Sequence, residues 1–206
     1  MRAAVLNSQP GQLDIEELNV DKPAADEVLI QVKGAGLCHS DLHFMEGLFR
    51  SKLPSVLGHE SAGIVQAVGE NVRYVKPGDH VICCTSIFCG QCRQCLSGNP
   101  ARCTNPAATS RPKGAAPRLT KADGTPVDQF ARLGGFGEEM LIHQNGVVKV
   151  TDDMPLDKAA LIGCGITTGM GAVFRTAKVP AGATVAVIGA GGIGLAAIQA
   201  ARIAGA

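Results

Sequence analysis

The chain has no tryptophan, only one tyrosine and six phenylalanines among its 206 residues. It also lacks an apolar run near the 18 residues that a membrane-spanning helix needs, and Met1 is followed at once by partly polar, strand-like sequence. An excess of charge is missing too, because 19 basic residues stand against 18 acidic ones and no segment concentrates Lys and Arg. We therefore expect a cytoplasmic protein without a signal peptide that binds neither a membrane nor nucleic acid.

Cysteine is present in number, but not at the density of a disulfide scaffold. Eight cysteines among 206 residues fall below the roughly 8–10% that marks such scaffolds. Without a secretion signal, clustered cysteines favour metal binding or catalysis over disulfides. With 46% hydrophobic and 18% charged residues, the composition fits an ordinary folded core.

The first 150 or so residues are typical of short strands separated by Gly and Pro turns. Apolar and polar residues alternate over residues 27–33, and residues 61–69 and 79–84 have the same strand character. Closely spaced strands of this kind predict a compact all-β barrel or sandwich.

The pattern changes after Pro155. Apolar residues at helical spacing predict a helix from Leu156, with Asp157 supporting its first turn. Residues 183–189 then predict a fully buried parallel strand, and residues 191–204 predict the helix that follows it, with Gly205 as its C-cap.

Residues 89–135 have no periodicity and no continuous apolar stretch, which is unusual for so long an excursion in a compact domain. Four cysteines lie within it at the spacing Cys-x2-Cys-x2-Cys-x7-Cys: Cys89, Cys92, Cys95 and Cys103. Zinc held tetrahedrally by four thiolates would order this segment and would leave no open position, so the spacing predicts a structural zinc site. Unrelated or disulfide-linked thiols and an iron–sulfur cluster are the alternatives, although the spacing does not match the ferredoxin patterns.

Three further places offer metal ligands. Cys38-His39-Ser40-Asp41-Leu42-His43 follows the first long strand, His59-Glu60 opens the second, and Cys164 lies between two glycines after the predicted helix. Each has a plainer interpretation when taken alone: a loop histidine, a solvated carboxylate, or an inert buried thiol.

A glycine-rich turn, Gly189-x-Gly191-Gly192-x-Gly194, stands between the last predicted strand and helix. In that context the pattern predicts dinucleotide binding. Gly189 would make the tight turn, Gly191 would admit the pyrophosphate, and Gly194 would let the helix pack on the strand. The helix N-terminus would offer amide donors to the phosphates.

Together and in this order, these motifs resemble the zinc-dependent alcohol dehydrogenases of the medium-chain dehydrogenase/reductase superfamily, from the first strand to the last residue. The segment between Cys103 and Phe136 resembles the class that holds the glutathione-dependent formaldehyde dehydrogenases and the animal-type enzymes. The resemblance implies a mixed fold with an all-β GroES-like catalytic domain at 1–164, whose zinc lobe spans 86–135. The first βα unit of an α/β Rossmann domain would follow at 165–206, and such a domain needs several further units.

The resemblance also implies roles for single residues. Cys38, His59 and Cys164 would ligate a catalytic zinc, and Asp41 would fix the tautomer of His59. Glu60 would lie behind the metal, tuning its field or coordinating it transiently. Ser40 and His43 would form a proton relay. His39, with the glycines of the turn, would contact the cofactor pyrophosphate.

The function implied is hydride transfer between a primary or secondary alcohol and NAD(P), with the aldehyde or ketone as the reverse substrate. Two zinc ions per chain, NAD in preference to NADP, and a homodimer or homotetramer are expected from the same resemblance. The alternatives are a thiol-dependent formaldehyde dehydrogenase, a zinc-free quinone reductase on the same scaffold, and a catalytically silent zinc-binding relative. Residues 1–206 alone are expected to be inactive, because half of the cofactor cleft would be missing, including the acidic residue that reads the ribose about 20 residues beyond the turn.

Overall fold

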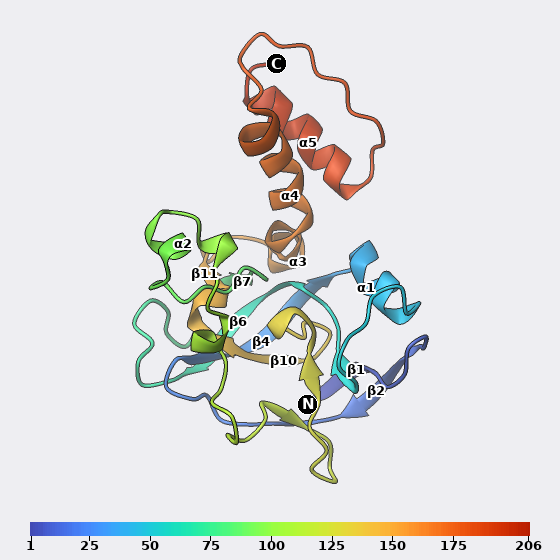
Figure 1. Ribbon diagram of the computed structural model, residues 1–206, viewed down its shortest axis with the longest axis vertical. Coiled ribbons are helices and arrows are strands. Elements are labelled where there is room, and N and C mark those ends of the chain that lie inside the picture. Colours follow the sequence, from blue (N-terminus) through green and yellow to red (C-terminus); the bar gives the residue numbers. More distant parts are fainter.

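The computed structural model describes all residues 1–206. Figure 1 shows a β domain from which the last helices project, with the C-terminus at the far end of the projection. The longest helix has 12 residues, and none combines the length and apolar character needed to cross a bilayer.

Eleven strands form the β domain. In chain order they are β1 (Arg2–Leu6), β2 (Leu13–Glu17), β3 (Asn19–Val20), β4 (Glu27–Gly36), β5 (Ser55–Val56), β6 (Glu60–Val68), β7 (His80–Cys83), β8 (Leu119–Thr120), β9 (Asp128–Gln129), β10 (Glu139–His143) and β11 (Val147–Lys149). They make a four-stranded sheet in the order β2-β1-β5-β9, a five-stranded sheet in the order β10-β4-β6-β7-β11, and the pair β3-β8. The predicted all-β character of this part is confirmed, and the three strands expected from the alternation are β4, β6 and β7.

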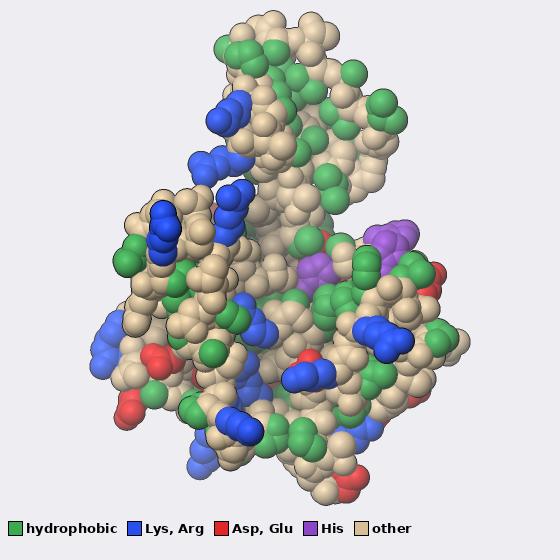
Figure 2. All heavy atoms as spheres, in the orientation of Figure 1, with side chains coloured by type: hydrophobic (Ala, Val, Ile, Leu, Met, Phe, Trp, Pro, Cys, Tyr) green, Lys and Arg blue, Asp and Glu red, His purple; other side chains and the backbone are tan.

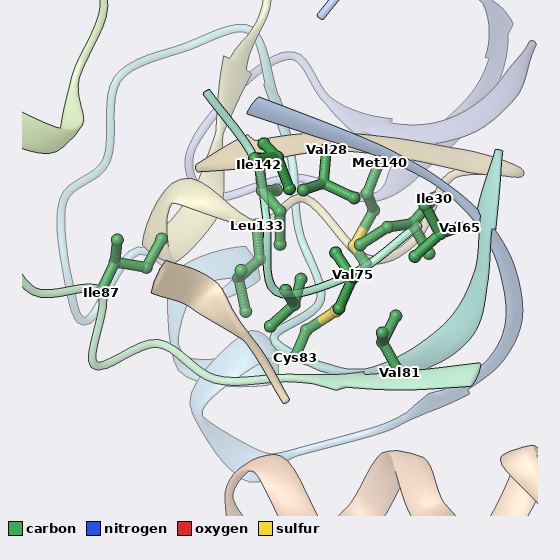
Figure 3. Packing of buried hydrophobic residues seen from close by; sticks show 12 residues of the cluster. Val28, Ile30, Val65, Val75, Val81, Cys83, Ile87, Leu133, Met140 and Ile142 are labelled. Atoms are coloured by element: carbon green, nitrogen blue, oxygen red, sulfur yellow. The ribbon is translucent and has the colours of Figure 1, made fainter. Parts of the chain in front are cut away.

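The core of the five-stranded sheet is a cluster of 12 buried residues. Figure 3 shows Val28 and Ile30 from β4 and Met140 and Ile142 from β10 pointing toward Val65, Val75 and Cys83. Because β4 pairs antiparallel with β10 in the register Ile30↔Met140 and Val28↔Ile142, their inward residues fall on one face. This core fixes the strand ends on which the candidate site is built.

The helical elements are short until the end of the chain. They are α1 (His39–Met45), α2 (Arg93–Leu96), α3 (Leu156–Ala159), α4 (Gly165–Gly171) and α5 (Gly192–Ile203), with 3₁₀ turns η1 (Pro100–Arg102), η2 (Pro106–Thr109), η3 (Phe130–Arg132), η4 (Gln144–Gly146) and η5 (Ala160–Gly163) and a π-helix η6 (Ala172–Ala177). The helical stretch predicted from Leu156 is confirmed as α3 followed by η5, and Cys164, with φ −140° and ψ −76°, separates it from α4.

Helix α5 agrees with the predicted helix, although its C-cap is Ala204 and Gly205, with a φ of +84°, is the residue after the cap. The segment before α5 does not agree with its prediction. Residues 183–190 form no strand, and Ile188 is fully exposed, so the prediction of a fully buried parallel strand over 183–189 is wrong for this chain. A parallel strand is satisfied only by neighbouring strands, and no strand of the three sheets lies beside this segment.

Candidate metal centres

The four cysteines of the lobe converge as the spacing predicts. Their sulfur atoms all lie within 4.8 Å of one another. Individual Sγ–Sγ distances are 3.9 Å for Cys89–Cys95, 3.4 Å for Cys92–Cys95 and 4.0 Å for Cys92–Cys103. A tetrahedron with zinc–sulfur bonds of about 2.3 Å has edges of about 3.8 Å, so the four sulfurs fit one zinc ion.

The ionisation of these thiols supports the same fit. Backbone N–H groups of Cys95 and Thr104 lower the pKa of Cys92 to about 5, whereas burial and the neighbouring sulfurs raise the pKa of Cys95 to about 11. Four thiolates this close repel one another, so all four ionise only with a cation among them. A metal that prefers sulfur meets that requirement.

The second centre is built from strand ends. Strands β4 and β6 pair antiparallel, with Gly36 opposite Glu60. Cys38 follows β4 by two residues and His59 precedes β6 by one, so both side chains arise at the same end of the sheet. The helical break at Cys164 brings the third sulfur there. Gly163 lies so close to strand β7 that a Cβ atom would collide with the carbonyl oxygen of Cys83.

The ligand atoms of this centre also converge. One atom each from Cys38, His59, Glu60 and Cys164 lies within 4.8 Å of the other three. His59 and Glu60 are both buried, at 5% exposure. Glu60 is also fixed from behind, because its Oε1 accepts a hydrogen bond of 3.2 Å from the backbone N–H of Gly165. Two sulfurs, an imidazole and a carboxylate form a donor set that suits zinc.

The carboxylate of Asp41 connects the segments that carry Cys38 and His59. It is buried at the start of α1, where its Oδ1 lies 3.2 Å from His59 Nδ1 and accepts the Gly58 N–H at 3.1 Å. Its Oδ2 accepts the N–H of Cys38 at 3.2 Å. A carboxylate at Nδ1 selects the tautomer that keeps Nε2 free as a ligand, and it raises the pKa of His59.

The two cysteines of this centre differ in their ionisation. Burial, with the charges of Cys38 and Glu60, raises the pKa of Cys164 to about 12. Burial also disfavours the Cys38 thiolate, but hydrogen bonds from Ser40 and the charge of His59 outweigh it and lower the pKa of Cys38. Both thiols can ionise together only with a cation between them, so the centre fits a metal as the lobe does.

The residues expected to move protons and contact a cofactor lie on α1. Ser40 Oγ is 3.7 Å from Cys38 Sγ. His39 and His43 face each other across one helical turn, with ring centroids 4.7 Å apart. Figure 2 shows histidine atoms beside α1 and others deeper, at the foot of the projecting helices. His39 is exposed and His43 half-buried, so both imidazoles reach solvent.

The glycine turn has the backbone that its sequence predicts. Gly189 has a φ of +96°, which disfavours other residues, and a Cβ on Gly194 would collide with the carbonyl oxygen of Gly189. Gly191 is the N-cap of α5 and Gly192 its first residue, and neither has another atom within 4 Å of a Cβ position. Gly191 and Gly192 are also exposed, and phosphate binding at this turn stays a prediction.

Sequence reasoning did not find the aromatic ring beside His59. The Phe130 ring lies 5.5 Å from the His59 ring and 4.4 Å from the Phe44 ring, so it covers one side of the second centre. Phe130 lies in η3, a 3₁₀ turn that no local periodicity announces. Its role depends on contacts between distant segments.

An antiparallel β domain with a four-cysteine lobe and a second centre of two cysteines and a histidine defines the class of GroES-like domains found in dehydrogenases. The family described as "Alcohol dehydrogenase GroES-like domain" matches residues 24–152. The chain therefore belongs to this alcohol dehydrogenase family.

Full-length relatives extend the match over the whole chain. It is 44% identical to the S-(hydroxymethyl)glutathione dehydrogenase of Paracoccus denitrificans over 214 residues, covering 100% of this chain and 56% of that protein. It is 44% identical to the NDMA-dependent alcohol dehydrogenase of Amycolatopsis methanolica over 208 residues, with the same coverage. The chain thus spans about half the length of the curated relatives it matches.

Solved structures give the same family. The alcohol dehydrogenase zinc-binding domain protein of Burkholderia ambifaria superposes with a TM-score of 0.91 at 38% identity, over 99% of this chain and 56% of that one. The benzyl alcohol dehydrogenase of Acinetobacter calcoaceticus superposes with a TM-score of 0.86 at 36% identity, over 100% of this chain and 56% of that one. The predicted fold class is confirmed.

Proposed function

We propose that the full-length protein is a zinc-dependent oxidoreductase that transfers hydride between a primary or secondary alcohol and NAD(P), with the aldehyde or ketone as the reverse substrate. The observation that carries this proposal is the convergence of Cys38, His59 and Cys164 on one point, with Asp41 hydrogen-bonded behind His59. Alcohol dehydrogenases among the relatives of known structure and sequence support it.

When bound, zinc would supply a Lewis acid that favours loss of the alcohol proton, and a nicotinamide would accept the hydride. The residues of the chain hold the proposed ligands in place and orient them. Asp41 keeps His59 in the tautomer with a free Nε2. Glu60, held by the N–H of Gly165, places a carboxylate beside the ligand atoms, where it would offset part of the charge of a bound metal.

Ser40 and His43 would carry the proton away. The Ser40 hydroxyl lies beside the Cys38 sulfur and can accept the proton at short range. His43 is half-buried one turn further along α1, where its imidazole reaches solvent and can pass the proton on.

The cofactor would be NAD in preference to NADP, held by Gly189, Gly191, Gly192 and Gly194 and by His39. The turn supports this proposal because its N–H groups lie at the start of α5, where the helix dipole favours phosphate. A homodimer or homotetramer in the cytoplasm completes the proposal. Comparing activity with NAD and with NADP, and measuring the mass of the purified full-length protein in solution, tests these points.

The central experiment measures metal and activity together on the full-length protein. We expect about two zinc ions per chain and alcohol-dependent reduction of NAD. Cys164→Ser should lose about one zinc and all activity, and Ser40→Ala should keep both zinc ions while its kcat falls by about 100-fold. Cys84→Ser is the matched control, since Cys84 belongs to neither cluster. Full activity in Cys164→Ser would overturn the proposal.

The chain of residues 1–206 by itself should bind metal but show no turnover. Its glycine turn is exposed, and residues 1–206 hold only the first part of the dinucleotide-binding domain that the resemblance implies. NAD-dependent alcohol oxidation by residues 1–206 alone would contradict this expectation.

A second candidate is a thiol-dependent formaldehyde dehydrogenase. It is favoured by the 44% identity to an S-(hydroxymethyl)glutathione dehydrogenase along the whole chain. Formaldehyde oxidation that requires added glutathione would select it, whereas oxidation of simple alcohols without a thiol would select the first proposal. A catalytically silent relative would bind about one zinc, in the lobe only.

A further inference from the structure

The Phe130 ring belongs to a connected set of aromatic contacts beside the second centre. It meets the His59 ring edge to face at 5.5 Å, and Phe44 of α1 at 4.4 Å. Phe44 in turn lies 5.7 Å from Phe49. The Phe130 ring therefore lies directly against the imidazole of His59, a proposed ligand of the second centre.

The backbone that carries Phe130 is strained. Ala131 and Arg132 follow it with φ angles of +53° and +63°, in the left-handed region that residues with a Cβ rarely adopt. Two such residues in succession persist only where the surroundings impose them. The N–H groups of Leu133 and Gly134 return to the Phe130 carbonyl, at 2.9 Å and 3.2 Å, but neither bond acts on the side chains of the two strained residues.

The Arg132 side chain supplies the missing restraint. Its guanidinium donates to the Thr109 hydroxyl at 2.7 Å and to the Ile87 carbonyl at 3.0 Å. Ile87 stands two residues before Cys89, and Thr109 ends the 3₁₀ turn η2 that follows Cys103. The Arg132 side chain thus donates hydrogen bonds to both ends of the segment that contains the four cysteines.

The charge of Arg132 has no carboxylate partner in the chain, since its two acceptors are neutral oxygens. Burial and the charge of Arg118 lower its pKa, and the negative charge of Cys103 acts in the opposite direction. A tetrathiolate zinc centre carries a net negative charge of about two, which a nearby guanidinium would offset. The lobe therefore attracts Arg132 electrostatically as well as through hydrogen bonds.

We propose that Arg132 is a positioning residue that ties the four-cysteine lobe to the Phe130 ring and so sets the width of the substrate space beside His59. The lobe then stabilises more than its own loop: through Arg132 it holds a strained turn whose ring faces the second centre. The kinetic part of this inference rests on the proposed function, whereas the structural part does not.

The structural part is tested by fluorine NMR on the full-length protein labelled with 4-fluorophenylalanine. The chain has six phenylalanines, and Phe130→Leu identifies the resonance of interest. We expect Arg132→Met to shift and broaden that resonance, because the strained turn loses its restraint, while the zinc content stays unchanged. Arg132→Lys keeps the charge but reaches one acceptor at a time, so it should shift the resonance less.

Arg102→Met is the matched control. Arg102 is an exposed arginine next to Cys103, and its side chain makes no hydrogen bond or ion pair to the β domain. The Arg102→Met substitution removes a positive charge from the lobe but leaves the strained turn at Ala131 and Arg132 unchanged. The Phe130 resonance should not move in this variant.

The kinetic part compares a large and a small alcohol. For Arg132→Met we expect the KM for benzyl alcohol to rise by about tenfold, with a smaller change for ethanol and a kcat within about threefold of the wild type, because the ring is displaced but the ligands are not. Arg132→Lys should restore part of the KM. A merely structural role would lower activity toward both alcohols in proportion to the zinc lost.

An unmoved Phe130 resonance in both Arg132 variants overturns the proposal, as does a loss of activity that follows zinc loss alone. If the wild type oxidises no alcohol, the proposed function fails, and the fluorine result still decides whether Arg132 positions Phe130. Should Arg132→Met not fold, Arg132→Lys carries the same comparison.

Discussion

The Nδ1 atom of His59 lies 3.2 Å from Oδ1 of Asp41, and the two side chains are 6% and 4% exposed. This pair joins α1 to the start of β6. Because Asp41 also accepts the N–H groups of Cys38 and Gly58, a single carboxylate orients two proposed ligands at once. The first prediction concerns this carboxylate.

Asp41→Asn should weaken metal binding at the second centre by about 10- to 100-fold, because an amide cannot hold both N–H groups and select the His59 tautomer equally well. Competition with a chromophoric zinc chelator measures the affinity. Glu46→Gln, at the exposed C-cap of the same helix, should leave it unchanged. An equal affinity in Asp41→Asn and the wild type would show that the carboxylate does not orient the ligands.

Cys103→Ser should release the lobe metal and open residues 89–110 to proteases. Within residues 88–118 only Thr109 is buried, so the segment has almost no core of its own to keep it ordered. Tryptic cleavage after Arg93 or Arg102 should become at least about tenfold faster, as read by mass spectrometry. Cys84→Ser should cleave at the wild-type rate. Unchanged protection in Cys103→Ser would mean that the lobe is ordered without metal.

Glu27 should make the fold sensitive to acid. Burial alone would raise its pKa, but hydrogen bonds from Arg111, the Ala24 N–H and Arg118 bring it to about 2, below the usual 4.5. The ionised carboxylate therefore stabilises the fold above about pH 4.5, and that stability is lost as the pH falls toward 2. Urea unfolding of the wild type and Glu27→Gln at pH 6 and pH 3 should show a difference that shrinks at the lower pH.

At pH 6 that difference should be about 3 kcal/mol, because the variant leaves two largely buried arginines without their shared partner. Metal lost in acid affects both proteins alike, so their difference isolates Glu27. Glu70→Gln, an exposed residue without a salt bridge, serves as the control. A difference that does not depend on pH would refute the assignment.

Two glycines of the dinucleotide turn should respond in opposite ways to the same substitution. Gly194→Ala would drive a methyl group into the Gly189 carbonyl and should destabilise α5 by about 2 kcal/mol. Gly192→Ala places its methyl in open space at the first helical position and should be neutral or stabilising by up to about 1 kcal/mol. Hydrogen exchange of the α5 amides measures both. Equal protection in the two variants would contradict the close approach at Gly194.

Sequence patterns predicted those parts of the fold whose cause is local. Alternation identified β4 because one of its faces lies in the core, and the cysteine spacing pointed to the lobe because cysteines so close in sequence need only tight turns to converge. The helical stretch from Leu156 was also found from its spacing, and Cys164 lies directly after it, as expected.

The residues that sequence reasoning missed depend on pairs of distant segments. Glu27 pairs with Arg111 and Arg118, and Arg132 reaches Ile87 and Thr109, each across a large part of the chain. No local pattern marks such a pair, because an arginine in a polar segment is ordinarily a solvated charge. The error over residues 183–189 has the converse cause: the local pattern is that of a strand, but pairing requires neighbours.

The extended segment at residues 183–190 has a consequence for handling the isolated chain. It presents apolar side chains, Val185 and Ile188 among them, on backbone whose N–H and C=O groups meet no sheet. Such a segment is a template for pairing with the same segment of another molecule. Residues 1–206 produced alone should therefore self-associate through this segment as their concentration rises, and a charged residue in place of Ile188 should keep them dispersed.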